Sequence, residues 1–224
     1  MNTPKSTPYF ATLDILRFKI KRNLKLFNVS VSSMSGVELS EELTRLSQGV
    51  DVLEFGSGGS TILLSKSAKN VLSIESDKKF AHFMKKKLKD LGFHNSRVEY
   101  VDIGPTVRYG YPNPKNQMKE AHNYGKYVNR AFELVDQNNM QPKLVFIDGR
   151  FRVWCFISAI LSLHQSFTIV VDDYFLRNQY SIMEEILGAP YKRISDAAFF
   201  RVEDVFRARS NITRASNVFQ YDPE

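Results

Sequence analysis

The chain has 224 residues, of which 43% are hydrophobic and 25% charged, and its formal net charge is +7 at pH 7. This length suffices for one well-packed domain and is short for two. No run reaches the roughly 18 apolar residues of a membrane span, and the polar N-terminus is unlike a signal peptide, so we expect a cytoplasmic protein without a transmembrane segment. A single cysteine, Cys155, excludes an intramolecular disulfide and a cysteine-based zinc site.

Much of the positive charge lies in two stretches, 17–27 and 78–89, where apolar residues recur at helical spacing between lysines and arginines. Such a pattern is typical of a solvated basic face above a packed apolar stripe, so we expect no nucleic-acid partner. The first stretch predicts an N-terminal helix, for which two roles stay open: a cap over the active site or a homodimer contact.

Beyond a second predicted helix at 36–46, segments typical of strands and helices alternate. Apolar strand segments are VDVLEF (50–55), NVLSIES (70–76), RVEYVD (97–102), KLVFID (143–148) and FTIVVDD (167–173), with closing strands near 191–194 and 198–202. Repeated βα units predict an α/β fold, with a doubly wound, Rossmann-like, seven-stranded sheet covered by helices on both faces. We divide the chain into an N-terminal helical segment, 1–48, and a second domain, 49–224.

One segment, 104–127, interrupts this alternation, because it is rich in glycine, proline, asparagine and tyrosine. It leaves from the carboxyl end of a strand, which is the ligand side of an open α/β sheet. We predict that it forms a substrate lid. His122 lies within it and is the histidine we would test as a catalytic base.

A glycine-rich turn follows the first strand and contains Gly56 and Gly58. Glycines there let backbone amides and a helix N-terminus approach a ligand closely. A dinucleotide fingerprint would place its third small residue where this chain has Thr61, so NAD is disfavoured. The preceding Glu54 would repel a pyrophosphate and suits a cationic ligand.

Two further carboxylates end the second and third strands. Glu75 follows the turn by about twenty residues, the distance at which an acidic side chain binds ribose hydroxyls, and Asp102 ends the next strand on the same edge. A ligand with a cationic amino-acid part, a ribose and a base would meet Glu54, Glu75 and Asp102 in turn. S-adenosylmethionine is such a molecule.

Here the sequence resembles the class I S-adenosylmethionine-dependent methyltransferases, whose first motif, acidic-x-Gly-x-Gly, is matched by residues 54–58. The resemblance covers roughly residues 50–202. It implies that Gly56 and Gly58 pass under the methionine part of the cofactor, that Glu75 binds the ribose and that Asp102 lies near the adenine.

The fourth and fifth strands also end in carboxylates: Asp148, and the pair Asp172 and Asp173. Neighbouring strand ends would bring them together, and they would repel one another unless a cation, a basic residue or shared protons compensated. Oxygen ligands of this kind suit Mg²⁺.

This pattern resembles the metal site of the catechol and caffeoyl-CoA O-methyltransferases and of bacterial relatives near the macrocin O-methyltransferases. The resemblance implies that Asp148, Asp172 and Asp173 bind a divalent ion that positions the acceptor. The chain departs from it where catechol-type enzymes carry a lysine base, since that position is Phe151, flanked by Arg150 and Arg152. Arg150 and Arg152 could instead pair with the aspartates or bind an anionic substrate; if Arg150 neutralises the aspartates, no metal is needed.

The sequence thus predicts an O-methyltransferase that acts on a hydroxyl of a small molecule or a glycan, with Asp148, Arg150 and His122 as candidate catalytic residues. Two alternatives stay open: a metal-independent sugar or amine methyltransferase, and a methyltransferase-like binding module without catalysis.

Overall fold

The structure is a computed structural model that describes residues 29, 36–107 and 110–212. The predicted helix at 17–27 lies outside the described residues. The strands are β1 (Asp51–Phe55), β2 (Asn70–Glu75), β3 (Ser96–Tyr100), β4 (Pro142–Ile147), β5 (Phe167–Val171), β6 (Lys192–Ile194) and β7 (Ala197–Val202). The α-helices are α2 (Val37–Ser47), α3 (Gly59–Ser67), α4 (Lys78–Asp90), α5 (Gln117–Gln137), α6 (Arg152–Ser162), α7 (Ile182–Leu187) and α8 (Val205–Ser210), with short 3-10 turns at Tyr174–Leu176 and Asn178–Ser181.

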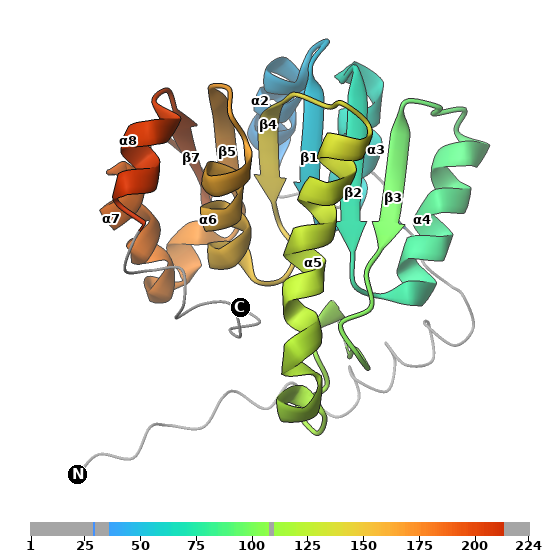
Figure 1. The fold of residues 1–224 in the computed structure, drawn as a ribbon. Coiled ribbons are helices and arrows are strands. Elements are labelled where there is room, and N and C mark those ends of the chain that lie inside the picture. Colours follow the sequence, from blue (N-terminus) through green and yellow to red (C-terminus); the bar gives the residue numbers. More distant parts are fainter. Residues whose placement is uncertain (1–28, 30–35, 108–109, 213–224) are drawn as a thin grey trace.

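The strands form one mixed sheet in the order β3-β2-β1-β4-β5-β7-β6. Strands β1 to β5 run parallel, whereas β7 pairs antiparallel with β5 and with β6. Helices cover both faces of the sheet (Figure 1). The predicted α/β fold with a seven-stranded, doubly wound sheet is confirmed. None of the helices in the described part of the chain combines the length and apolar character that a membrane span requires.

The sheet is buried on both faces, which explains why its strands are apolar without a period of two. In β1, Leu53 and Phe55 point into the cluster that α5 and α6 cover. Val52 points to the opposite face, where it packs with Leu39 and Leu43 of α2. Helix α2 therefore shares a core with the sheet, although it belongs to the predicted segment 1–48.

The predicted lid, 104–127, is only partly irregular, because α5 begins at Gln117. The prediction of a loop through residue 127 was wrong for its second half. Tyr124, Tyr127, Val128 and Ala131 recur at helical spacing and are buried against the sheet, which fixes this stretch as a helix. Gly125 made the helical pattern harder to recognise in the sequence. A glycine is required at this position because a Cβ there would lie 2.9 Å from the Trp154 ring.

The turns after β1 and β4 pack backbone against backbone. Gly56 has a φ of +95°, and a Cβ at this position would lie 2.6 Å from the Gly149 nitrogen. A Cβ at Gly149 would in turn lie 2.8 Å from the Gly56 nitrogen. The glycine of the predicted cofactor turn is therefore needed first for a close contact with the loop that carries Asp148.

This contact predicts that alanine substitutions at two glycines of positive φ lower the stability of the fold by different amounts. Gly56→Ala should lower the free energy of unfolding by about 1 to 3 kcal/mol more than Gly49→Ala, because only the former adds overpacking to backbone strain. Gly49 is the matched control, since its φ is +69° and a Cβ added there would meet nothing within 4 Å. Urea denaturation of both variants measures the difference, and equal losses would contradict the packing argument.

Candidate active site

The predicted acidic residues at the ends of β2 to β5 lie at one edge of the sheet. Glu75 is the last residue of β2, Asp102 follows β3 by two residues, and Asp148 directly follows β4. Asp172 and Asp173 directly follow β5. Because β1 to β5 are parallel, their carboxyl ends meet at this edge, which is where open α/β sheets bind ligands.

Glu54 supports the glycine turn from inside the protein. Its side chain is fully buried, and its carboxylate oxygens accept hydrogen bonds from the hydroxyls of Ser60 (2.5 Å) and Thr61 (2.6 Å) at the start of α3. Burial raises the pKa of Glu54 to about 7, although these hydroxyls act to lower it. Glu54 therefore anchors the start of α3 in this structure, and its contact with the cationic part of a ligand stays a prediction.

The same hydrogen bonds account for Thr61, the residue that disfavoured a dinucleotide. Its hydroxyl oxygen also accepts a bond of 2.8 Å from the amide of Gly58, the residue before α3. Gly58, Thr61 and Glu54 thus form one chain of bonds from the glycine turn into the core. This chain fixes the amino-terminal end of α3, which has no acidic residue in its first turn and presents backbone N–H groups to the ligand side.

Glu75 connects the end of β2 to the glycine turn. One of its oxygens, Oε1, accepts hydrogen bonds from the amides of Ser76 (2.7 Å) and Asp77 (2.8 Å). The other, Oε2, accepts one from the amide of Ser57 at 3.2 Å. Burial raises the pKa of Glu75 to about 7 against the effect of these amides. Gly110 lies over this carboxylate, since a Cβ there would be 3.5 Å from Oε1.

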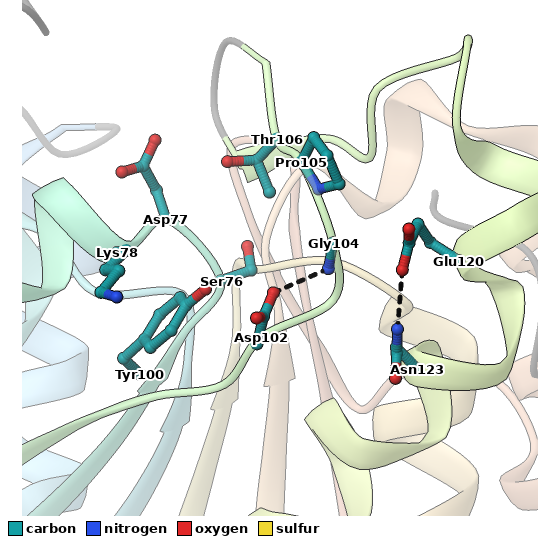
Figure 2. Close-up of a pocket in the computed structure, with 10 residues that line it drawn as sticks. All are labelled: Ser76, Asp77, Lys78, Tyr100, Asp102, Gly104, Pro105, Thr106, Glu120 and Asn123. Atoms are coloured by element: carbon teal, nitrogen blue, oxygen red, sulfur yellow. Dashed lines mark hydrogen bonds between the residues drawn. The ribbon is translucent and has the colours of Figure 1, made fainter.

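Asp102 lines a cavity of about 410 Å³ beside the ends of β2 and β3 (Figure 2). Its side chain is exposed and accepts a hydrogen bond of 2.9 Å from the amide of Gly104. On the far side of the cavity Asn123 donates to Glu120 at 2.8 Å. The other lining residues are Ser76, Asp77, Lys78, Tyr100, Pro105 and Thr106. Ser76 and Thr106 offer hydroxyls, and Tyr100 offers an aromatic edge, a combination that suits a nucleoside.

The second group of carboxylates surrounds a buried guanidinium. The Arg152 side chain is 2% exposed, and its Nη2 donates to Asp148 Oδ1 at 2.9 Å and lies 3.4 Å from Asp173 Oδ2. It also donates to the backbone oxygens of Asp148 (3.1 Å), Gly149 (3.1 Å) and Asp172. Arg152 therefore ties the loop after β4 to the loop after β5.

The three aspartates are together as predicted, but the cation among them is an arginine. The sequence left Arg150 and Arg152 as possible partners of the aspartates and named Arg150 as the residue that could make a metal unnecessary; in the structure Arg152 is the residue paired with them. Burial, assisted by the carboxylates of Asp148 and Asp173, raises the pKa of Asp172 to about 7. Burial also raises the pKa of Asp148, whereas the positive charge of Arg152 acts to lower that pKa.

A divalent ion does not fit this arrangement. The guanidinium of Arg152 already takes the inward-facing oxygens of Asp148 and Asp173 as its partners. In the ranges 36–107 and 110–212, no three histidine, cysteine, aspartate or glutamate side chains are grouped as metal ligands. The metal role predicted for Asp148, Asp172 and Asp173 would require Arg152 to leave.

Strained backbone marks both loops of the aspartate site. Phe151 (φ +56°) and Asp173 (φ +52°) adopt the left-handed conformation, which is unusual for a residue with a side chain. Phe151, at the position of the missing lysine base, is buried and packs on Tyr124 at 4.9 Å between ring centroids. This strain places Arg152 at the start of α6, where its side chain turns back to the aspartates.

The other two predicted catalytic residues, His122 and Arg150, lie in different places relative to the aspartates. His122 is exposed on α5, with Nδ1 3.0 Å from the Lys119 carbonyl, and none of the described hydrogen bonds or ion pairs connects it to the aspartates. Arg150 is 6% exposed, and its guanidinium lies 3.8 Å from the centroid of the Tyr111 ring. The structure therefore brings Arg150, but not His122, to the site.

Sequence reasoning missed two residues at this edge, Arg177 and Tyr180. Both lie between β5 and α7, in a segment that forms short 3-10 turns before the helix begins. Arg177 Nη2 is 3.8 Å from Asp173 Oδ2, and the Arg177 guanidinium is 5.8 Å from the Tyr180 ring centroid. No sequence signal distinguished them from surface residues of a helix.

The sheet order, the glycine turn after β1 and the acidic residues after β2 and β3 define an open α/β protein, in which the carboxyl edge of the sheet is the usual ligand side. The chain matches no protein-family model and none of the curated proteins. Among solved structures, a methyltransferase-like protein from Silicibacter pomeroyi is 32% identical, covers 76% of this chain and 87% of its own, and has a TM-score of 0.68. The chain belongs to the class I S-adenosylmethionine-dependent methyltransferases.

More distant structures are similar over much of the chain. An O-methyltransferase from Bacillus cereus in complex with S-adenosylhomocysteine is 12% identical, over 91% of this chain and 78% of its own, with a TM-score of 0.48. An rRNA methylase from Streptococcus thermophilus is 11% identical, over 77% and 99% of the two chains, with a TM-score of 0.44.

The buried position of Arg152 predicts a large effect on stability. Arg152→Met should lower the free energy of unfolding by about 3 to 5 kcal/mol, because it leaves buried carboxylate and carbonyl oxygens without their partner. The control is Arg130→Met, since Arg130 bonds Glu99 and Glu133 but its side chain is 34% exposed; we expect a loss of about 1 kcal/mol or less. Urea denaturation measures both, and a loss at Arg152 as small as the control would refute the assigned role.

Proposed function

We propose that this methyltransferase methylates an oxygen of a small hydroxylated molecule or a glycan, and that it does so without a divalent metal. The proposal that no metal is needed rests on Arg152, whose guanidinium lies where the metal-dependent resemblance would require the ion. Methylation of an oxygen is supported by the carboxylate of Asp148, which lies at the strand end beside that guanidinium and can act as a base for a hydroxyl proton.

The residues at the ends of β1, β2 and β3 fit S-adenosylmethionine. The cavity at Asp102 is of the size that binds small ligands. Asp102 has lone-pair capacity beyond its bond to Gly104, and Glu75 Oε2 accepts one bond where a carboxylate oxygen accepts two. We assign the adenine end to Asp102 and the ribose to Glu75, over which Gly110 would then have to move. Gly56 and Gly58 leave the backbone of the turn open to the methionine part.

Asp148 is the base of the proposed reaction. Arg152 holds its Oδ1, while 40% of the side chain stays exposed toward the ligand edge. S-adenosylmethionine supplies a methyl group on a positively charged sulfur, which is a good leaving group. Asp148 takes the proton of the acceptor hydroxyl as that oxygen bonds the methyl carbon, while the bond from this carbon to sulfur breaks and neutral S-adenosylhomocysteine leaves. Arg152 is a positioning residue, since it orients Asp148 without contacting the acceptor.

Cofactor binding is tested by calorimetric titration of S-adenosylmethionine into the wild type and Asp102→Ala. We expect the variant to bind about 10- to 100-fold more weakly, the effect of losing a hydrogen bond to a charged group. Asp90→Ala is the control, because Asp90 is exposed on α4 and pairs only with the exposed Lys86 among the described ion pairs. No binding by the wild type would refute the function, and equal binding by Asp102→Ala would refute the orientation assigned to the cofactor.

Metal-free oxygen methylation is tested by incubating the protein with methyl-labelled S-adenosylmethionine and a panel of phenols, catechols, sugars, amino sugars and sugar acids in excess EDTA. We expect labelled methyl ethers or esters to form at the same rate with EDTA as with Mg²⁺, and Asp148→Asn to lower that rate by about 100-fold or more. Cofactor affinity of Asp148→Asn, measured alongside, should match the wild type. A rate that depends on Mg²⁺ would contradict the role of Arg152, and label found only on amines would contradict oxygen methylation.

A further inference from the structure

Arg150 is a buried cation with two unused donor atoms. Its Nε and Nη1 are buried and have no hydrogen-bond partner among the described residues. Its near neighbour in sequence, Arg152, bonds oxygens of four residues, so the aspartates already have their cation. Leaving a charged donor buried and unpaired is costly, and proteins retain such a group mainly where a ligand completes it.

The surroundings of Arg150 converge on one point. Tyr111 stacks on its guanidinium, with the ring centroid 3.8 Å away. Arg177 lies beside Tyr180, with its guanidinium 5.8 Å from the ring centroid, and the fully buried Tyr180 hydroxyl likewise has no hydrogen-bond partner in the described part of the chain. Burial raises the pKa of Tyr111, but the guanidinium groups of Arg150 and Arg177 lower it more, so both cations face the same ring.

The carboxylates nearby do not satisfy Arg150. Asp173 is bonded to Arg152 and lies 3.8 Å from Arg177. Asp148 acts on Arg150 only through space, since the described ion pairs include Arg152 and not Arg150 as its partner. The positive charge of Arg150 therefore remains available to an anion that enters from the ligand edge.

We propose that Arg150, together with Arg177 and the Tyr180 hydroxyl, binds an acidic group of the methyl acceptor, either a carboxylate or a phosphate. A guanidinium matches the oxygens of both groups in geometry and in charge. The position favours the acceptor over the cofactor: Arg150, Arg177 and Tyr180 follow β4 and β5, whereas the cavity and Glu75 belong to β2 and β3. This inference rests on the proposed function and narrows its acceptor to acidic molecules.

The test is calorimetric titration of 4-hydroxybenzoate, phenyl phosphate and the uncharged 4-hydroxybenzamide into the protein saturated with S-adenosylhomocysteine. We expect one of the two anions to bind and the amide not to bind; whichever anion binds tells a carboxylate site from a phosphate site. Arg150→Gln should weaken that binding at least tenfold, and Arg150→Lys should restore part of it. Arg201→Gln is the matched control, because Arg201 also stacks on a tyrosine, Tyr191 at 4.8 Å, but is exposed and lies on β7 opposite Thr168 near the start of β5, away from the carboxyl ends of the strands.

Two further readings distinguish binding from a structural role. S-adenosylhomocysteine should bind Arg150→Gln within twofold of the wild type, and the melting temperature of the variant should be unchanged or higher, since an unpaired buried charge has been removed. The proposal is overturned if neither anion binds, if Arg150→Gln binds the anion as well as the wild type does, or if it loses cofactor affinity tenfold. Failure of the wild type to bind S-adenosylhomocysteine at all would instead refute the proposed function and, with it, the acceptor assignment.

Discussion

The ligand edge of this protein depends on one buried cation. Arg152 bonds carbonyl or carboxylate oxygens of Asp148, Gly149, Asp172 and Asp173, and so connects the loops after β4 and β5. Without a cation, three neighbouring carboxylates at this edge would repel one another. The guanidinium resolves that conflict from within the chain, and it does so in a strained backbone at Phe151 that directs the side chain inward.

A close contact between two glycines connects the aspartate site to the glycine turn after β1. Gly149 packs on Gly56, so the loop that Arg152 fixes also fixes the turn after β1. Glu75 reaches the same turn through the amide of Ser57. In the proposed function, the nucleoside binds the half of the edge at β2 and β3 and the acceptor binds the half at β4 and β5, with the glycine contact between them.

Much of the fold was predictable because burial on both faces leaves apolar strands, and the turns between them carry glycine and acidic residues. The positions of Glu75, Asp102 and the three aspartates followed from the parallel strands alone. The direction in which each side chain points could not be predicted from the parallel strands. Sequence spacing could not show that Glu54 points into the core, or that Arg152, rather than Arg150, turns back to the aspartates, since both outcomes depend on packing around them.

The central claim, that an arginine replaces a metal in this site, is tested most directly by a crystal structure with S-adenosylhomocysteine and excess Mn²⁺, recorded with anomalous scattering. We expect S-adenosylhomocysteine along Glu75 and Asp102, Arg152 still bonded to Asp148, and no anomalous peak among the aspartates. A manganese peak bonded to Asp148, Asp172 and Asp173, with Arg152 displaced, would contradict this claim.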